Sequence, residues 1–277
     1  MSTVSAAIAR REAPEAFAGS PWIDAAAAAV SHAPYLARLI ERRPDLVENL
    51  NPDWPSQMVQ QSMQTAARIV HEPMPMDAAM HELRRAKDGV HLACAIADLS
   101  RAWPLMRVTG ALTEFADASV RAAVAMATRD MAARGQIDLA RIAEPEAPSG
   151  FTVIAMGKMG AHELNYSSDI DFSVFYDIEK LESLGAREPR VTAVRMVAPL
   201  VRVLEEITAD GYVFRTDLRL RPDPGSTPVA VSIAAAAHYY QTLGQNWERA
   251  AFIKARAIAG DRELGEDFLS ELQPFIW

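Results

Sequence analysis

The sequence has a single cysteine and no apolar run of membrane-spanning length. Cys94 lies in an Ala- and Leu-rich helical pattern, so a disulfide framework is excluded and a reducing compartment is favoured. No apolar stretch approaches the ~20 residues that a transmembrane helix needs. Residues 1–17 also lack the apolar segment of a signal peptide. These absences predict a soluble, cytoplasmic protein with no membrane partner.

The chain also lacks an excess of positive charge. Its formal net charge is −8, whereas a general nucleic-acid binder should carry a basic surface. Of the 277 residues, 50% are hydrophobic and 23% are charged, which is typical of a globular protein. This length suffices for two domains with sizeable cores.

Residues 1–150 are predicted to be almost wholly helical, because apolar residues recur at helical spacing between proline breaks. The predicted helices are 25–30, 35–43, 58–70, 77–99 and 109–134. His71, His81 and His91 do not have the spacing of metal ligands on one helix, so we expect surface or capping residues. The segment EPEAPSG at 144–150 is rich in proline and small residues and predicts a linker. We therefore expect two domains, 1–150 and 151–277.

After Gly150 the periodicity changes from helical to strand-like. The predicted strands are 151–156, 170–176 and 213–220, and the predicted helices are 191–208, 232–243 and 261–272. Ser232 is a candidate N-cap. Pro199 lies inside its predicted helix and should kink it or split it in two. The pattern predicts an α+β protein with a small mixed sheet flanked by helices. The chain ends in Phe275, Ile276 and Trp277, and we expect it to be a fragment of a longer protein.

One stretch, FTVIAMGKMGAHELNYSSDIDFSVFYD at 151–177, carries a candidate site. Asp169 and Asp171 are two residues apart on a predicted strand, so they share a face with Ser173 while Ile170, Phe172 and Val174 face a core. Adjacent carboxylates repel, and a divalent cation between them relieves that repulsion. The glycines of the preceding turn allow backbone N–H groups to approach a phosphate. The alternative is an ordinary turn followed by a solvated strand face.

A third acid follows in VFRTDLRLRPD, where alternation places Asp217 with Arg215, Arg219 and Arg221 on one strand face. Such an acid completes a two-metal site, and arginines bind phosphate oxygens in a bidentate manner. A surface ladder of ion pairs is the alternative. Further along, NWERAAFIKAR gathers an aromatic ring and several cations. Its lysine and arginines suit a second anion, while Trp247 either stacks on a base or packs structurally.

These motifs together resemble the glutamine synthetase adenylyltransferase/adenylyl-removing enzyme family, within the DNA polymerase β-like nucleotidyltransferase superfamily. The resemblance rests on GKMGAHELNYSSDIDFSVFYD, RTDLRLRPDPGSTP and YYQTLGQNWERAAFIKARAIAGD, and more weakly on ELRRAKDGVHLACAIADLS. The spellings ELNYSSDID and WERAAFIKAR are similar to the N-terminal, adenylyl-removing half of that bifunctional enzyme. The chain departs from the commoner family pattern at Ala161, His162 and Phe172.

The resemblance implies phosphorolysis of the AMP–tyrosine bond of adenylylated glutamine synthetase, with inorganic phosphate as nucleophile and ADP as product. It also implies coupling to the PII signal protein through the full-length enzyme. Three carboxylates would hold two Mg²⁺ ions, and nearby groups would bind phosphate or nucleotide. The implied metal ligands and catalytic residues are Asp169, Asp171 and Asp217, and the implied phosphate or nucleotide ligands are Gly157, Lys158, Ser168, Arg219, Arg221, Lys254 and Arg256.

Three other functions stay open at this point. The same site supports the opposite reaction, transfer of AMP from ATP to a tyrosine. A non-catalytic regulatory module is disfavoured because Asp169, Asp171 and Asp217 are all present. A nucleic-acid nucleotidyltransferase is disfavoured by the acidic charge balance.

Overall fold

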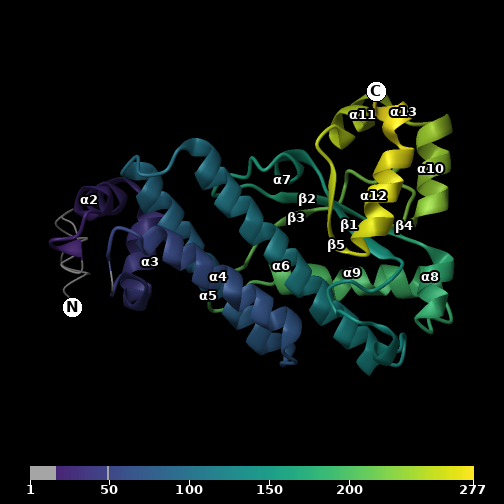
Figure 1. The fold of residues 1–277 in the computed structure, drawn as a ribbon, viewed down its shortest axis with the longest axis horizontal. Helices are drawn as coiled ribbons and strands as arrows, with labels where there is room; N and C mark the ends of the chain where they lie inside the picture. Colours follow the sequence, from purple (N-terminus) through teal and green to yellow (C-terminus); the bar gives the residue numbers. More distant parts are fainter. Residues whose placement is uncertain (1–16, 49) are drawn as a thin grey trace.

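The computed structural model describes residues 17–48 and 50–277, which form an elongated molecule with helices at one end and a sheet at the other (Figure 1). The stretch in which we predict no signal peptide lies outside the described residues, apart from Phe17. No helix in the described part of the chain is long and apolar enough to cross a membrane. The α+β class predicted from the sequence is confirmed.

The helical part contains three long helices packed on one another, with shorter helices at their far end (Figure 1). Its elements are α2 (Ile23–His32), α3 (Pro34–Arg42), η2 (Pro44–Val47), α4 (Trp54–His71), α5 (Met76–Leu99), α6 (Leu105–Ala133) and η3 (Leu139–Arg141). The predicted helices are all present, within a few residues at each end. Pro34 and Pro55 lie in the first turns of α3 and α4, where the missing N–H has no intrahelical partner to lose.

The sheet is mixed and has β2 at its centre. Its strands are β1 (Phe151–Ala155), β2 (Ile170–Tyr176), β3 (Thr216–Asp217), β4 (Ala230–Ser232) and β5 (Arg256–Gly260). The strand β1 pairs antiparallel with both β2 and β5. On its other edge β2 pairs in parallel with β3 near its start and with β4 near its end. The start of β2 is therefore the point where two acidic strand segments meet.

Helices cover both faces of this sheet (Figure 1). The second part contains α7 (Gly157–Gly160), α8 (Ile178–Ser183), α9 (Pro189–Glu205), α10 (Ile233–Thr242), α11 (Asn246–Phe252), α12 (Arg262–Glu271) and α13 (Gln273–Ile276). Phe172 and Val174 pack in the core with α6 and α9, as predicted, while Phe175 packs with α10 and α12. Ser173 shares the face of the aspartates but is fully buried, because these helices cover that face beyond Asp171.

Pro199 does not split α9, which runs unbroken from Pro189 to Glu205. Proline removes the hydrogen bond to the carbonyl four residues earlier. That residue is Arg195, which is exposed, so its carbonyl can meet water. The predicted helix ran too far at its other end, since Ile207 lies beyond α9 and is 80% exposed.

The third strand is much shorter than predicted, because only Thr216 and Asp217 pair with β2. Before it, the N–H groups of Val213 and Phe214 donate to the carbonyl of Leu204 at the end of α9. After it, the Arg219 N–H donates to the Asp217 side chain, which starts a turn. The sequence pattern also missed β4, β5 and the short helices α7, α8 and α11.

One hydrophobic core extends across the predicted boundary at Gly150. It joins buried residues of α4, α5 and α6 to those of β1, β2, β5 and α9. The segment 144–150 is tied to the sheet as well: Gly260 N–H donates to the Glu146 carbonyl, and Asp177 N–H donates to the Gly150 carbonyl. The change in secondary structure falls where predicted, and the division into two domains remains a prediction.

Two of the three histidines lie at the surface, as expected. His71 and His81 have side chains 62% and 54% exposed. The prediction was wrong for His91, which is only 4% exposed on α5 and approaches the hydroxyl of Tyr35 at 3.4 Å. Burial lowers the pKa of His91 to about 3, so its imidazole is neutral at physiological pH.

Candidate nucleotidyl-transfer site

The turn between β1 and β2 places backbone directly against a carboxylate. Gly157 begins α7 with a φ of +54°, in the left-handed region that suits glycine. A Cβ atom there would lie 2.5 Å from Oδ2 of Asp171. Any other residue at 157 would therefore displace that carboxylate. The Met156 N–H also donates to the Asp171 carbonyl at 2.9 Å, which joins the two segments.

The strand register brings the third acid to the other two. Asp171 is the direct partner of Asp217 in the parallel pairing of β2 and β3. Neighbouring strands lie about 5 Å apart, and paired residues point to the same face. Asp169 precedes β2 and lies on that same face by alternation. The structure therefore gathers the three predicted carboxylates at one end of the sheet.

The surroundings shift the pKa values of two of these carboxylates in opposite directions. Partial burial raises the pKa of Asp171, and the charges of Asp217 and Asp169 raise it further. Lys158 and Arg219 oppose that rise. By contrast, hydrogen bonds from Arg219 lower the pKa of Asp217. A nearby cation would oppose the repulsion that raises the pKa of Asp171.

Arginines engage the two outer carboxylates. Arg215 Nε donates to Asp169 Oδ1 at 2.5 Å, and Arg219 Nη2 donates to Asp217 Oδ2 at 2.5 Å. No group of three or more acidic, His or Cys side chains is arranged to hold a metal ion in the part of the chain that the structure describes. The donor chemistry nevertheless suits Mg²⁺, which prefers carboxylate oxygen. Binding two Mg²⁺ ions here stays a prediction.

Two of the predicted phosphate ligands lie beside the carboxylates. Lys158 is exposed on α7, and its charge acts on Asp171. Ser168 immediately precedes Asp169, and its hydroxyl accepts from the N–H of Asn165 at 3.2 Å. Together with Gly157 they line the turn between β1 and β2, and their role in phosphate binding stays a prediction.

Other predicted ligands are engaged elsewhere. Arg221 donates to four backbone carbonyls of its own loop. Arg256 on β5 forms a bidentate pair with Asp117 of α6 and also donates to the carbonyls of Met159 and Gly160. Both guanidinium groups therefore brace backbone in this structure, and their role in phosphate binding stays a prediction.

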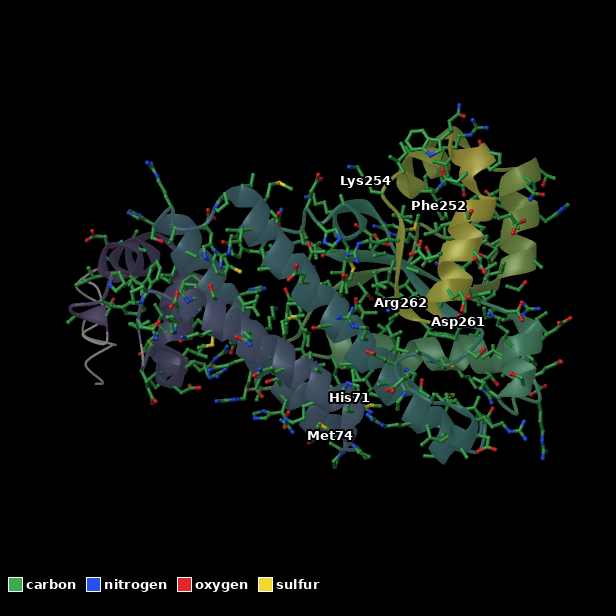
Figure 2. The ribbon with its side chains drawn as sticks, in the orientation of Figure 1. His71, Met74, Phe252, Lys254, Asp261 and Arg262 are labelled. Atoms are coloured by element: carbon green, nitrogen blue, oxygen red, sulfur yellow. The ribbon has the colours of Figure 1, made fainter. Side chains whose placement is uncertain are left out.

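The remaining candidate cation lies at one end of β5. Lys254 is exposed in the turn between α11 and β5, whereas Asp261 and Arg262 follow the opposite end of that strand (Figure 2). Nearby, the Trp247 ring is 52% exposed. Glu248 is buried instead, and its carboxylate caps α11 by accepting from the N–H of Gln245 at 2.7 Å.

The sequence pattern did not reveal Tyr212 or the ion pair of Arg215 at this site. Strand alternation placed Arg215 on the acidic face but did not reveal its ion pair with Asp169. Tyr212 carried no signal, because its hydroxyl reaches Arg215 Nη1 at 3.1 Å only through the loop that leaves α9. Arg215 also donates to the Ser167 carbonyl at 2.9 Å, so it fixes the loop that carries Asp169.

An acidic strand end beside a glycine turn, in a small mixed sheet behind a helical region, is the arrangement expected of a nucleotidyltransferase. Comparison with known families identifies the family of the chain. The family model for glutamate-ammonia ligase adenylyltransferase matches residues 23–271. The chain belongs to this family.

Similar proteins are curated as bifunctional glutamine synthetase adenylyltransferase/adenylyl-removing enzymes. The chain is 48% identical to the one from Caulobacter vibrioides over 244 residues, which cover 88% of this chain and 25% of that protein. It is 44% identical to the one from Rhizobium meliloti over 264 residues, covering 93% of this chain and 27% of the relative. The chain therefore spans about a quarter of the length of these relatives.

Proposed function

We propose that this chain is an adenylyl-removing domain, which phosphorolyses the AMP–tyrosine bond of adenylylated glutamine synthetase and releases ADP. The observation that carries the proposal is the register of Asp171 with Asp217 beside a glycine that backs directly onto Asp171. Family membership and the motif spellings that resemble the adenylyl-removing half support it. The full-length enzyme would act in the cytoplasm and respond to the PII signal protein.

The three carboxylates and the glycine turn have different roles in the proposed reaction. Asp169, Asp171 and Asp217 would hold two Mg²⁺ ions, which when bound supply a Lewis acid for the phosphoryl oxygens and for the leaving tyrosine oxygen. Lys158 and the N–H groups of the turn at Gly157 orient the phosphate oxygens. A tyrosine phenol has a pKa near 10, so the leaving oxygen needs less help from a general acid than an alkoxide would.

Arg215 and Arg219 form ion pairs with Asp169 and Asp217. If these carboxylates bound metal instead, each guanidinium would be available next to the site to bind a phosphate oxygen. Arg219 suits this exchange best, because its side chain is 82% exposed. The phosphate itself is the nucleophile, so no side chain has to form a covalent intermediate.

The test is the substitution Asp171→Asn, which keeps the size of the side chain and removes its charge. We expect ADP formation from adenylylated glutamine synthetase, Mg²⁺ and phosphate to fall at least ~100-fold, as for loss of a principal electrostatic group. Asp24→Asn, an exposed acid on α2, is the control and should retain full activity. Retained turnover in Asp171→Asn would refute the metal role. Incorporation of AMP from ATP, without ADP formation from the adenylylated protein, would instead assign the opposite direction.

A further inference from the structure

A cavity lies between the helical part and the loops that precede β2 and β3. Its volume is about 460 Å³. Tyr35 from α3 and His91 from α5 form one side, while Tyr166, Ser167 and Tyr212 come from the loops. Three tyrosines and a histidine from four separate segments thus enclose one space.

Aromatic rings of Tyr35, His91 and Tyr166 form part of the cavity wall. His91 packs edge-to-face between two tyrosines, with ring centroids 6.1 Å from Tyr35 and 6.2 Å from Tyr166. Its imidazole is neutral, because burial depresses its pKa. Aromatic walls of this kind stack on flat rings and are worth ~1–3 kcal/mol for each nucleobase.

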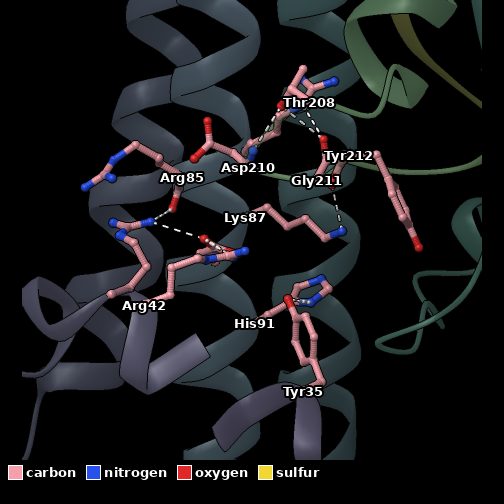
Figure 3. Close-up of polar contacts among 12 residues, drawn as sticks. Tyr35, Arg42, Arg85, Lys87, His91, Thr208, Asp210, Gly211 and Tyr212 are labelled. Carbon is pink, nitrogen blue, oxygen red and sulfur yellow. Dashed lines mark hydrogen bonds and ion pairs between the residues drawn. The ribbon is translucent and has the colours of Figure 1, made fainter. Parts of the chain in front are cut away.

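A lysine extends between the two aromatic sides (Figure 3). Lys87 Nζ donates to the Tyr212 carbonyl at 2.9 Å and lies 4.3 Å from the centroid of the Tyr212 ring. No carboxylate lies within ion-pair distance of Lys87 among the residues that the structure describes. Burial lowers its pKa to about 8, so the ammonium is still mostly charged at neutral pH. An ammonium has three N–H donors, and one is occupied here.

Two residues of the cavity wall, Ser167 and Tyr212, lie close to the carboxylate site. The Tyr212 hydroxyl bonds to Arg215, which pairs with Asp169. Ser167 lies two residues before Asp169, so their Cα atoms are within about 7 Å of each other. The cavity wall and the residues around Asp169 are therefore neighbours in the structure.

We propose that this cavity binds the purine ring of the adenylyl group, and that its aromatic walls and Lys87 determine base specificity. This inference rests on the proposed function, because it assumes an adenylyl group at the carboxylates. The volume lies within the range of pockets that hold small ligands. Lys87 and the Tyr212 hydroxyl, which accepts from Arg215 and keeps its own O–H, supply donors for the acceptor nitrogens of the ring, and the 5′-phosphate then points toward Ser167 and Arg215.

The experiment compares ligands and variants by calorimetry in the presence of Mg²⁺. AMP should bind at least tenfold more tightly than ribose 5-phosphate, which lacks the ring. Ala33→Phe fills the cavity from the segment between α2 and α3, and it should abolish that preference. Lys87→Met should weaken AMP binding at least fivefold while ribose 5-phosphate is unaffected. Ala140→Phe, at an exposed position of η3, is the matched control and should change neither ligand.

Three results would overturn the proposal. The first is equal affinity for AMP and ribose 5-phosphate, and the second is AMP binding that is unchanged in Ala33→Phe and Lys87→Met. The third is that these substitutions weaken the binding of phenyl phosphate but not the binding of AMP. The last result would mean that the acceptor tyrosine enters the cavity. A peptide carrying adenylylated tyrosine presents the same base as AMP and should compete with AMP for the cavity. Calorimetry measures binding without turnover, so a base preference can be observed even if the protein shows no phosphorolysis. Conversely, the proposed phosphorolysis is not contradicted if Ala33→Phe leaves AMP binding unchanged.

Discussion

Replacement of Gly157 by alanine tests the close approach of the turn to Asp171. At a φ of +54° an L-residue is disfavoured by roughly 1–2 kcal/mol. The added Cβ would also lie 2.5 Å from Asp171 Oδ2, so the carboxylate has to move. Each kcal/mol lowers the melting temperature of a domain of this size by about 2–4 °C. We expect a fall of about 2–8 °C in melting temperature.

The loss of activity should be far larger than this loss of stability. Misplacing a reacting group by 1 Å reduces rate by ~100-fold. Gly135→Ala is the matched control, because Gly135 has a φ of +66° but open space around its Cβ position. It should show a similar drop in melting temperature with full ADP formation. The reasoning is refuted if the two variants lose equal activity, or if Gly157→Ala binds Mg²⁺ and turns over like the unmodified protein.

Two further predictions concern stability. The folded-state pKa of Asp171 is raised above its ordinary 3.8, so its contribution to stability is largest at low pH and is lost as pH rises through the interval above 3.8. Without Mg²⁺, Asp171→Asn should therefore melt at a higher temperature than the unmodified protein at pH 7 and show no such difference below pH 3; the same gap at both pH values contradicts this. Arg84 is fully buried and donates to the carbonyls of Met80, Val203, Glu206 and Gly211. Each buried acceptor left unpaired costs ~1–3 kcal/mol, so Arg84→Met should lower the free energy of unfolding by ~3 kcal/mol or more, which urea denaturation measures; an unchanged midpoint would count against it.

Elements with strong local patterns were predictable from the sequence. The strand 170–176 was located at its observed ends, because apolar residues and turn residues bound it clearly. The predicted strand 213–220 failed, since alternation cannot show that Val213 and Phe214 bond to Leu204 instead of to a neighbouring strand. The strand β5 at Arg256–Gly260 was not predicted, because the preceding cluster of cations drew attention to charge and the burial of the strand depends on contact with β1.

The acidic residues of the candidate site could be located from the sequence, but the residues that form ion pairs around the site could not. The spacing of Asp169 and Asp171 and the position of Asp217 on a second strand indicated a shared face, and the register of β2 with β3 agrees. The bidentate pair of Arg256 with Asp117 joins positions 139 residues apart, and no local pattern carries that information. The aromatic cavity was missed for the same reason, because its walls come from segments that meet only in the folded chain.

The apolar core shared by α6, α9 and the sheet has a practical consequence for anyone who wishes to shorten this protein. A version that starts at Phe151 would uncover the side of β1 and β2 on which Phe151 and Val153 now pack fully buried. It would also remove Asp117, leaving Arg256 without its acidic partner beneath the glycine turn. The long helices therefore form the surface against which the acidic strands pack and by which they are held in place.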